Sequence, residues 1–402
     1  MHGHMHHMHH GLYGGGQRAH VGRIEKPLIM PRYIPPSEMR MFATAPTKVQ
    51  PPAVIYPQSK DWSANPLRPR SLAEMVGQEK LKPIWRLLID SAKASGRPMG
   101  HALFTGAPGT GKTTFASVIA QECGVDWFEL KAPISLDMLC ALACAARDGD
   151  LVFVDEIHTI TKGDRREHTT SVDPENLYRL LEDGVCQLPL DAELRFPDLP
   201  IGADEHGVKH VVFPQLTWLA ATTDPGRLPQ PLLDRFTYQP VLEPYTSSEM
   251  DTIVLRNLKA LGVKWEADLE AVYLFSNASR GIPRMGNKYV RAANDLAADH
   301  LLTYTLAKLV VNDLNSTTDD GLTGRMQTIL TFLYQRCERW SKTSGRVHQA
   351  SLNLLATACG TDTKSIVFSE EPWLVRSGLL EVRPGGRTLT PAGETRARQL
   401  LA

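Results

Sequence analysis

The most informative stretch of the sequence for chemistry is GAPGTGKT, which occupies residues 106–113. It matches the pattern G-x-x-x-x-G-K-[ST], in which glycines let the backbone wrap closely around phosphate groups and point its N–H groups inward. In such a loop Lys112 reaches the β- and γ-phosphates of ATP and the Thr113 hydroxyl binds Mg²⁺. An apolar strand expected at 102–105 and a helix after the loop supply the context that the pattern requires. The sequence therefore predicts a nucleotide-binding site.

Two carboxylates follow a second expected strand in LVFVDEIH, residues 151–158. Four apolar residues bury this strand and place Asp155 and Glu156 at its C-terminal end, where ligands bind in open α/β sheets. We predict that Asp155 holds Mg²⁺ through water and that Glu156 polarises the attacking water. The alternative interpretation is a strand that ends in two solvated acids.

Three further polar residues are candidates for the same reaction. The apolar run LTWLAATT ends at Thr223, whose hydroxyl at a strand tip is suited to sensing a γ-phosphate. Arg235 in PLLDRF and Arg284 in RGIPR bracket a helical segment. Arginines stabilise the charge that develops on a transferring phosphoryl group, and one of these two is expected to act on a neighbouring subunit. Judged by spacing alone, each arginine fits a surface salt bridge equally well.

The order of apolar and polar patterns divides the chain into four segments. Residues 1–58 are rich in histidine, glycine and proline and bury too little apolar surface to offset their ordering entropy, which predicts disorder. In residues 59–241 short apolar strands alternate with helical patterns, which predicts an α/β domain with a parallel sheet. Residues 242–316 are typical of a small helical domain, and the polar linker NSTTDDG leads into a last domain at 317–402.

Composition sets limits on the class of protein. A chain of 402 residues with 42% hydrophobic residues supports two or three packed domains. Because 44 basic residues balance 44 acidic ones, any grip on DNA must come from a local patch. Six cysteines without zinc-binding spacing are typical of a reducing compartment. The sequence contains no run of about 18 apolar residues and no signal peptide, which predicts a cytoplasmic protein.

The C-terminal stretch EEPWLVRSGLLEVRPGGRTLTPAG, residues 370–393, has the pattern of a winged helix. A helical run at 371–378 leads into a short strand at 379–380, a glycine-rich turn with two arginines and a threonine-rich second strand. Residues 321–402 carry eleven Lys and Arg against six Asp and Glu, an excess of five positive charges. We predict that this wing grips DNA phosphates without reading the base sequence.

Taken together, these stretches resemble AAA+ ATPases of the RuvB family, the bacterial motors of Holliday-junction branch migration. The resemblance runs from about Leu67 to the C-terminus. It rests on LRPRSLAEMVGQEKL, GAPGTGKTT, VDEIH, NLYRLLEDG, AATTDPGRLPQPLLDRF, LEPYT, SRGIPRMGN and the wing, in the order of the family. It implies an AAA+ domain, a helical lid domain and a C-terminal winged-helix domain. It also implies an ATP- and Mg²⁺-dependent ring, hexameric by resemblance to the family, that moves double-stranded DNA at Holliday junctions.

The resemblance also implies roles for individual residues. Leu67 and Arg68 line the adenine pocket, and Tyr245 contacts the nucleotide. The phosphates lie against Gly106, Gly109, Gly111, Lys112, Thr113 and Thr114. A further nucleotide-contacting stretch falls on Glu182, Asp183 and Gly184. Thr223 corresponds to sensor 1, Arg235 to an arginine finger that acts in trans, and Arg284 to sensor 2. Arg387 falls on a DNA-contacting arginine of the wing.

The sequence departs from the family at two other expected DNA contacts. One of the family's wing arginines falls on Val382, with Arg383 one residue later. A second basic contact falls on Thr363, with Lys364 beside it. A shift of one residue in a strand turns a side chain to the opposite face, although a loop tolerates it. Lys364 and Arg383 are therefore the candidate substitutes.

A third departure concerns a partner protein. In the family, the segment that corresponds to 185–212 forms a hairpin that docks on RuvA, the junction-binding protein. Here the segment is longer, and its expected tip, GADEHGVKH, is charged rather than apolar. The sequence therefore does not decide whether this chain binds a RuvA-like partner.

Two other functions combine similar parts. Replication initiators and clamp or helicase loaders also join an AAA+ core to a winged helix, but they load partners instead of translocating. An ATP-gated signalling switch pairs a phosphate-binding loop with a winged helix and generally lacks a trans-acting arginine. Sequence-specific binding to one DNA site favours the first alternative, and a stable ADP-bound monomer favours the second.

Overall fold

The structure is a computed structural model that describes residues 65–402, except 132–133, 160–171, 268 and 345–348. The extension at 1–58, which we expect to be disordered, lies outside the described residues. The disorder of this extension therefore stays a prediction. Among the helices of the described residues, none is long and apolar enough to cross a lipid bilayer.

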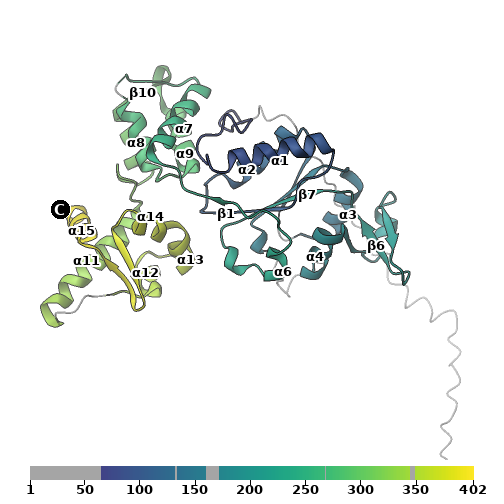
Figure 1. The fold of residues 1–402 in the computed structure, drawn as a ribbon. Helices are drawn as coiled ribbons and strands as arrows, with labels where there is room; N and C mark the ends of the chain where they lie inside the picture. Colours follow the sequence, from purple (N-terminus) through teal and green to yellow (C-terminus); the bar gives the residue numbers. More distant parts are fainter. Residues whose placement is uncertain (1–64, 132–133, 160–171, 268, 345–348) are drawn as a thin grey trace, which may run out of the picture. The chain divides into compact units, whose positions relative to one another are not determined.

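The first part of the described chain is built on a five-stranded parallel sheet (Figure 1). The strand order is β2-β3-β7-β1-β8. Every pairing in this sheet is parallel, which confirms the predicted parallel α/β architecture. Strand β7 lies between β1 and β3, although it follows both in the sequence. The strands are β1 (Ala102–Gly106), β2 (Trp127–Lys131), β3 (Leu151–Asp155), β7 (Thr217–Thr222) and β8 (Val241–Leu242).

Helices cover both faces of this sheet, each over its own apolar core. On one face, Trp85, Phe104 and Phe115 pack together with ring centroids 5.4–5.9 Å apart. On the other face, Phe128 and Val154 are buried under different helices. The first face carries α1 (Lys82–Ser95) and α2 (Lys112–Cys123), and the second carries α3 (Leu136–Ala145), α4 (Pro174–Asp183) and α6 (Gln230–Leu233) (Figure 1).

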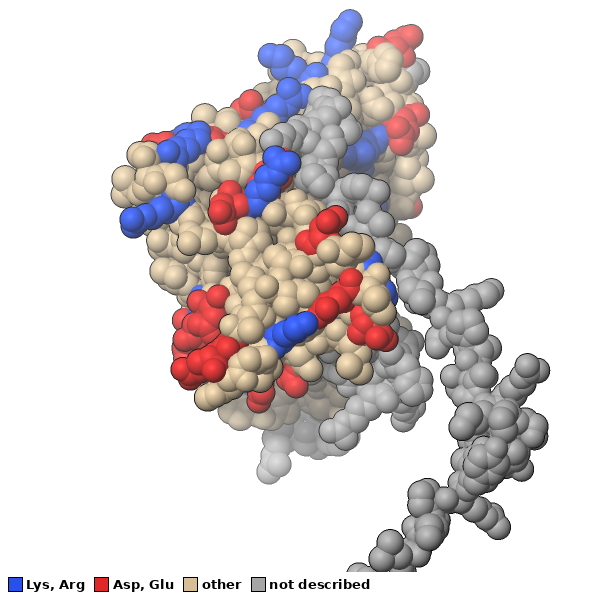
Figure 2. All heavy atoms as spheres, turned by 90° about the vertical axis from the view of Figure 1, so that its right-hand side faces the viewer, with Lys and Arg blue, Asp and Glu red and all other residues tan. Residues whose placement is uncertain are grey.

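A second, antiparallel sheet follows α4, in the order β4-β6-β5. Its strands are β4 (Val185–Gln187), β5 (Ile201–Ala203) and β6 (Lys209–Val212), with the short helix α5 (Ala192–Arg195) between the first two. The hairpin tip carries the expected charges, but its Val208 is 61% exposed. Leu190 and Leu194, at the start of the segment, are 91% and 83% exposed. The segment therefore exposes apolar side chains in addition to the expected charges. Viewed from the side of the molecule that carries this sheet, acidic and basic side chains are both exposed among the other residues (Figure 2).

The next part of the chain has a separate apolar core around Phe275 and Tyr289. Its helices are α7 (Ser247–Ala260), α8 (Glu270–Ala278), α9 (Pro283–Leu296) and α10 (Tyr304–Lys308), followed by a π-helical turn at Leu309–Asp313. A capping box at Thr246 and Glu249 begins α7. The sequence predicts that this segment is helical. The structure adds a short parallel pair of strands, β9 (Lys264–Trp265) and β10 (Leu301–Leu302).

The last part has its own core as well, to which Met326, Ile329, Leu330 and Leu333 of its first helix contribute. The helices are α11 (Gly324–Ser344), α12 (Leu352–Ala358), α13 (Thr363–Ser365), α14 (Glu371–Arg376) and α15 (Pro391–Leu401). A π-helical turn at Ile366–Glu370 joins α13 to α14. Strands β11 (Leu380–Arg383) and β12 (Gly386–Leu389) pair antiparallel and form the predicted wing.

Candidate active site

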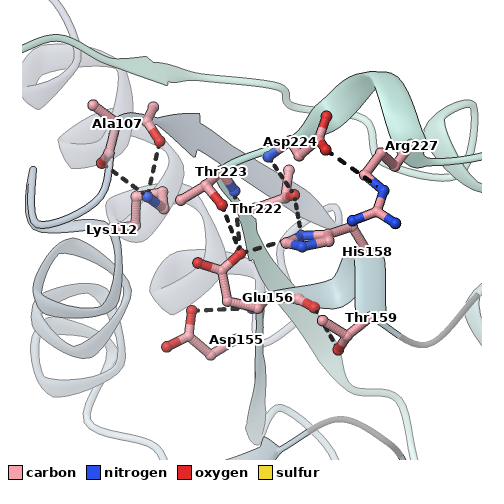
Figure 3. A network of polar contacts seen from close by, with 11 residues as sticks. Ala107, Lys112, Asp155, Glu156, His158, Thr159, Thr222, Thr223, Asp224 and Arg227 are labelled. Carbon is pink, nitrogen blue, oxygen red and sulfur yellow. Dashed lines mark hydrogen bonds and ion pairs between the residues drawn. The ribbon is translucent and has the colours of Figure 1, made fainter. Parts of the chain in front are cut away.

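The loop between β1 and α2 has the geometry that its glycines predict. Gly106, Gly109 and Gly111 have φ of +146°, +81° and +100°, which side chains rarely tolerate. A Cβ on Gly106 would lie 2.5 Å from the carbonyl oxygen of Leu242. The Lys112 ammonium donates to the carbonyl oxygens of Gly106 and Ala107 at 2.9 and 3.1 Å (Figure 3). The loop thus surrounds the Lys112 ammonium group with its own carbonyl oxygens.

Burial changes the electrostatics of this lysine. Desolvation lowers the pKa of Lys112, while the nearby Glu156 and Asp155 carboxylates oppose that shift. An anion such as a phosphate group would replace the loop carbonyls as the partner of the ammonium and recover the lost solvation.

The carboxylates at the end of β3 are held in different ways (Figure 3). Asp155 accepts the backbone N–H of Glu156 at 3.0 Å. Glu156 itself has φ of +48°, an uncommon conformation for a residue with a side chain. Its Oε2 accepts the backbone N–H and the hydroxyl of Thr223 at 3.2 and 3.1 Å. The tip of β7 therefore orients the carboxylate at the tip of β3.

His158 is a further residue of this network, which the sequence did not single out. Its Nδ1 lies 3.2 Å from Oε2 of Glu156 and 2.9 Å from the Thr222 hydroxyl. His158 follows the carboxylates by two residues on the short 3₁₀-helix Ile157–Thr159. A helical turn directly after the strand would bring His158 back toward the strand end. The sequence does not indicate which side chain His158 contacts there.

A cavity of about 590 Å³ lies beside this network, a volume typical of small-molecule sites. Most of the expected nucleotide-binding residues line it. These are Leu67, Arg68, Gly109, Gly111, Lys112, Thr113, Thr114, Asp155, Glu156, Tyr245 and Arg284. Gly106 and Thr223 touch the site through Lys112 and Glu156 instead. Glu182, Asp183, Gly184 and Arg235 are not among its lining residues.

One face of α9 supplies cavity residues that the sequence analysis missed. Arg284, Asn287, Lys288 and Arg291 occur at spacings of i, i+3, i+4 and i+7, so they share one side of the helix. Arg291 also donates to Oδ1 of Asn65 at 3.1 Å. The helical spacing was visible in the sequence and could have identified this polar face.

Two more missed residues close the cavity from other elements. Arg256 on α7 donates to the carbonyl oxygens of Leu67 and Glu74, each at 3.1 Å, and burial lowers its pKa. Glu129 on β2 adds a third carboxylate to the lining. Because the partners of Arg256 are more than 180 residues away in sequence, no local pattern indicated it.

Tyr245 joins three segments around the cavity. Its backbone N–H donates to the Gly281 carbonyl oxygen at 2.9 Å. Its ring packs so closely on Gly77 that a Cβ there would lie 2.8 Å away. Its hydroxyl lies 3.6 Å from the Cβ position of Gly111. Tyr245 therefore lies against the phosphate-binding loop with its hydroxyl and against the turn that leads into α9 with its backbone.

Comparisons with known proteins decide which family has this arrangement. The family described as Holliday junction DNA helicase RuvB P-loop domain matches residues 67–242. The chain is 33% identical to the Holliday junction branch migration complex subunit RuvB of Nocardioides sp., over 81% of this chain and 84% of that protein. It is 32% identical to RuvB 1 of Synechococcus sp., over 85% and 84%.

The chain belongs to the RuvB family. The structure of the Thermotoga maritima RuvB Holliday junction branch migration motor superposes with a TM-score of 0.63 and 26% identity, covering 83% of this chain and 99% of that one. The predicted AAA+ fold and the resemblance to RuvB are thus confirmed. As a RuvB-family protein, the chain is an ATPase that acts in the branch migration of Holliday junctions.

In this RuvB-family chain, Arg235 is held away from the chain's own nucleotide cavity. It makes an ion pair with Glu182, donates to the carbonyl oxygens of Tyr178 and Pro231, and lies 5.0 Å from the Tyr178 ring centroid. Gly184 ends α4 directly after Asp183, with φ of +67°. The structure therefore brings Arg235 together with the 182–184 stretch, apart from the loop that binds phosphate.

The candidate DNA contacts of the wing do not all lie on one face. Arg387 makes a two-pronged ion pair with Glu371, at 2.6 and 3.2 Å. Val382 pairs directly with Arg387, so these two side chains share a face, and Arg383 points to the other face. Arg383 is exposed and pairs with Glu381, and Lys364 is exposed. The one-residue shift noted in the sequence therefore does change the face that carries the charge.

Proposed function

We propose that this chain is the ATP-hydrolysing motor of a branch-migration complex and that its nucleotide is ATP bound with Mg²⁺. The observation that carries the proposal is the arrangement around the 590 Å³ cavity. A buried lysine lies in a glycine loop on one side, and a carboxylate held by Thr223 lies on the other. This pairing supplies phosphate binding and an oriented base for water in a single site.

The residues present fit a magnesium ion. The Thr113 hydroxyl and the Asp155 carboxylate both line the cavity, and hard oxygen ligands are those that Mg²⁺ prefers. Bound there, Mg²⁺ would neutralise charge on the β- and γ-phosphates. Lys112 would bind the same phosphates, Leu67 and Arg68 would lie along the adenine, and Arg284 would approach the γ-phosphate from the lid. Glu156 would hold the proton-accepting oxygen toward the attacking water.

Arg235 supports a ring in which each site is completed by the next subunit. Its position with Glu182, Asp183 and Gly184, outside the cavity of its own chain, fits residues that act on a neighbour. We propose a closed ring, hexameric by resemblance to the family, in which Arg235 stabilises the transition-state charge in trans. Its ion pair with Glu182 would hold the guanidinium ready in the isolated subunit.

The C-terminal segment provides the contact with DNA in this proposal. Residues 59–241 act as the ATPase domain, 242–316 as the lid and 317–402 as the winged-helix domain. Lys364, Arg383 and Arg387 are the proposed phosphate contacts. Relatives are named as subunits of a branch migration complex, which supports a RuvA-like partner for this chain too. The exposed Leu190, Leu194 and Val208 provide apolar surface on the segment expected to dock it.

The proposal is tested by ATP hydrolysis of the purified protein alone, with linear duplex, and with a synthetic four-way junction. We expect Mg²⁺-dependent hydrolysis that DNA stimulates, with the strongest effect from the junction. Hydrolysis that only one specific DNA sequence stimulates would favour a loader or initiator. A stable ADP-bound monomer that no DNA stimulates would favour a signalling switch. Native mass spectrometry of the same samples would measure the size of the ring.

A further inference from the structure

The nucleotide cavity has two chemically different sets of lining residues. The glycine loop with Lys112 suits phosphates, whereas an apolar lining suits the flat face of a nucleobase. Four of the five apolar residues named below belong to one short loop, residues 67–76, so whatever holds this loop affects the base separately from the phosphates. The apolar lining consists of Leu67, Pro69, Met75, Val76 and Ile253.

One side of the loop at 67–76 is anchored in the α/β part of the chain. Leu72 and Met75 are buried in the apolar core that α1 and α2 cover. The backbone N–H of Leu72 also donates to Oε1 of Glu122 on α2 at 2.8 Å. These contacts fix Leu72 and Met75, but they do not hold the backbone at Leu67, where the loop begins.

A single arginine of α7 holds the loop from the other side. Arg256 donates from Nη2 to the Leu67 carbonyl oxygen and from Nη1 to the Glu74 carbonyl oxygen, each at 3.1 Å. Its Nε and Nη2 also donate to Oδ1 of Asn257, at 3.1 and 3.0 Å. A guanidinium group has five N–H donors, and protein acceptors occupy four of them here. Arg256 is therefore arranged to hold protein backbone rather than to bind a nucleotide directly.

A second contact holds the start of the loop from α9. Oδ1 of Asn65 accepts the backbone N–H of Leu67 at 3.3 Å and also accepts from Arg291 at 3.1 Å. Both backbone polar groups of Leu67 are thus bonded to an arginine, either directly or through Asn65. The two helices are joined by Nδ2 of Asn257, which donates to Oδ1 of Asn287 at 2.5 Å. Helices α7 and α9 therefore hold the start of the loop together.

We propose that Arg256 and Arg291 are positioning residues that shape the pocket for the nucleobase by holding the loop at 67–76 from α7 and α9. The nucleoside and the phosphates are then bound by separable parts of the cavity. Loss of either arginine lets the start of the loop move, which weakens the contacts with the base but leaves the glycine loop in place. This inference rests on the proposed function in one respect, namely that Leu67 and Arg68 lie along the adenine.

Two ligands separate the base from the phosphates. ADP and inorganic pyrophosphate each carry two phosphates and only ADP carries a nucleoside, so the ratio of their dissociation constants measures what the nucleoside contributes. Isothermal titration calorimetry with Mg²⁺ gives both constants for the full chain. For Arg256→Met we expect the Kd for ADP to rise about tenfold, the loss that one hydrogen bond to a charged group produces. The Kd for pyrophosphate should stay within about twofold of wild type, which also shows that the variant is folded.

Arg256→Lys distinguishes the shape of the guanidinium group from its charge. A lysine keeps the positive charge, but its single nitrogen does not match a fork that reaches two carbonyl oxygens. We expect the Kd for ADP of Arg256→Lys to lie within about threefold of that of Arg256→Met. Lys264→Met is the matched control for the loss of charge, because Lys264 is exposed on β9 and is not among the cavity's lining residues. It should bind both ligands as wild type does.

Asn65→Ala tests the contact from α9. It removes the acceptor of Arg291 and the bond to the Leu67 N–H, and we expect the Kd for ADP to rise about threefold and the Kd for pyrophosphate to stay unchanged. Asn65 is not part of an apolar core, so this variant tests the proposal even if Arg256→Met does not fold. In ATP hydrolysis, both variants should raise KM by a larger factor than they lower kcat, because the phosphate-binding residues stay in place.

Equal weakening of ADP and pyrophosphate binding in Arg256→Met would overturn the proposal, because the arginine would then act on the phosphates. Unchanged ADP affinity in both Arg256→Met and Asn65→Ala, or wild-type affinity in Arg256→Lys, would overturn it as well. A wild-type protein that binds ADP no more tightly than pyrophosphate would refute the adenine pocket of the proposed function, and this inference with it. A wild-type preference for ADP that Arg256→Met fully retains would refute the positioning role alone.

Discussion

Replacing Thr223 by valine tests how Glu156 is held. The substitution keeps the shape of the side chain and the backbone N–H that donates to Oε2 of Glu156, but it removes the hydroxyl that donates at 3.1 Å. A hydrogen bond to a charged group contributes about 1.5–3 kcal/mol. Because the Glu156 side chain is 41% exposed, solvent screening places the effect near the lower limit.

A loss of about 1.5 kcal/mol in the oriented state of Glu156 corresponds to a roughly tenfold decrease in kcat. Thr223 does not line the cavity, so the KM for ATP should change little. The assay is steady-state ATP hydrolysis with junction DNA. Thr223→Ser, which retains the hydroxyl, is the matched control and should remain within about twofold of wild type.

The sign of the change decides between two interpretations of the contact. If Thr223 orients Glu156 for catalysis, Thr223→Val slows hydrolysis. An increase in kcat would show that the hydroxyl holds the carboxylate away from the water, which would refute the reasoning. An unchanged kcat in both variants would show that the His158 and backbone contacts suffice.

Three other predictions follow from the same geometry. Gly109→Ala should weaken ATP binding by at least tenfold in a fluorescent-nucleotide titration, because the φ is +81° and the new Cβ would lie 2.7 Å from the Ile282 side chain; binding like that of wild type would contradict the loop geometry. Arg235→Ala and Lys112→Ala should each abolish hydrolysis, and mixing the two should restore part of the ATPase if Arg235 acts in trans, whereas no recovery in verified mixed rings would argue for action within one chain. Arg387→Ala should weaken binding to duplex of any sequence and reduce the slope of log K against log salt by about one, as measured by anisotropy; Glu371→Gln, which frees Arg387 from its ion pair, should strengthen binding, and an unchanged affinity in both would exclude this face of the wing from DNA contact.

The parts of the site that could be predicted from sequence are those where backbone geometry restricts the residue type. The phosphate loop needs glycines at positive φ, and strand ends of a parallel sheet meet at one edge, which is why Lys112, Asp155 and Glu156 line one cavity. The face change between Val382 and Arg383 also followed from strand alternation alone.

Other parts depend on contacts between distant segments and could not be read from a local pattern. Arg256 meets Leu67 across 189 positions, and Arg235 meets Glu182 across 53. Arg280 contradicts the ordinary expectation that a charged residue is exposed. Its Nη1 lies 3.4 Å from Sδ of Met326, in a different segment of the chain, so no local pattern indicated its burial.

The most direct test of the central claim follows the strands of a synthetic four-way junction, with homologous arms, while the protein hydrolyses ATP. The account predicts conversion of the junction to duplex products with ATP and Mg²⁺, by the chain alone or after addition of a RuvA protein, and no conversion by Lys112→Ala. Hydrolysis that proceeds with junction bound but leaves the strands unmoved, with and without RuvA, would contradict the claim that this chain is a branch-migration motor.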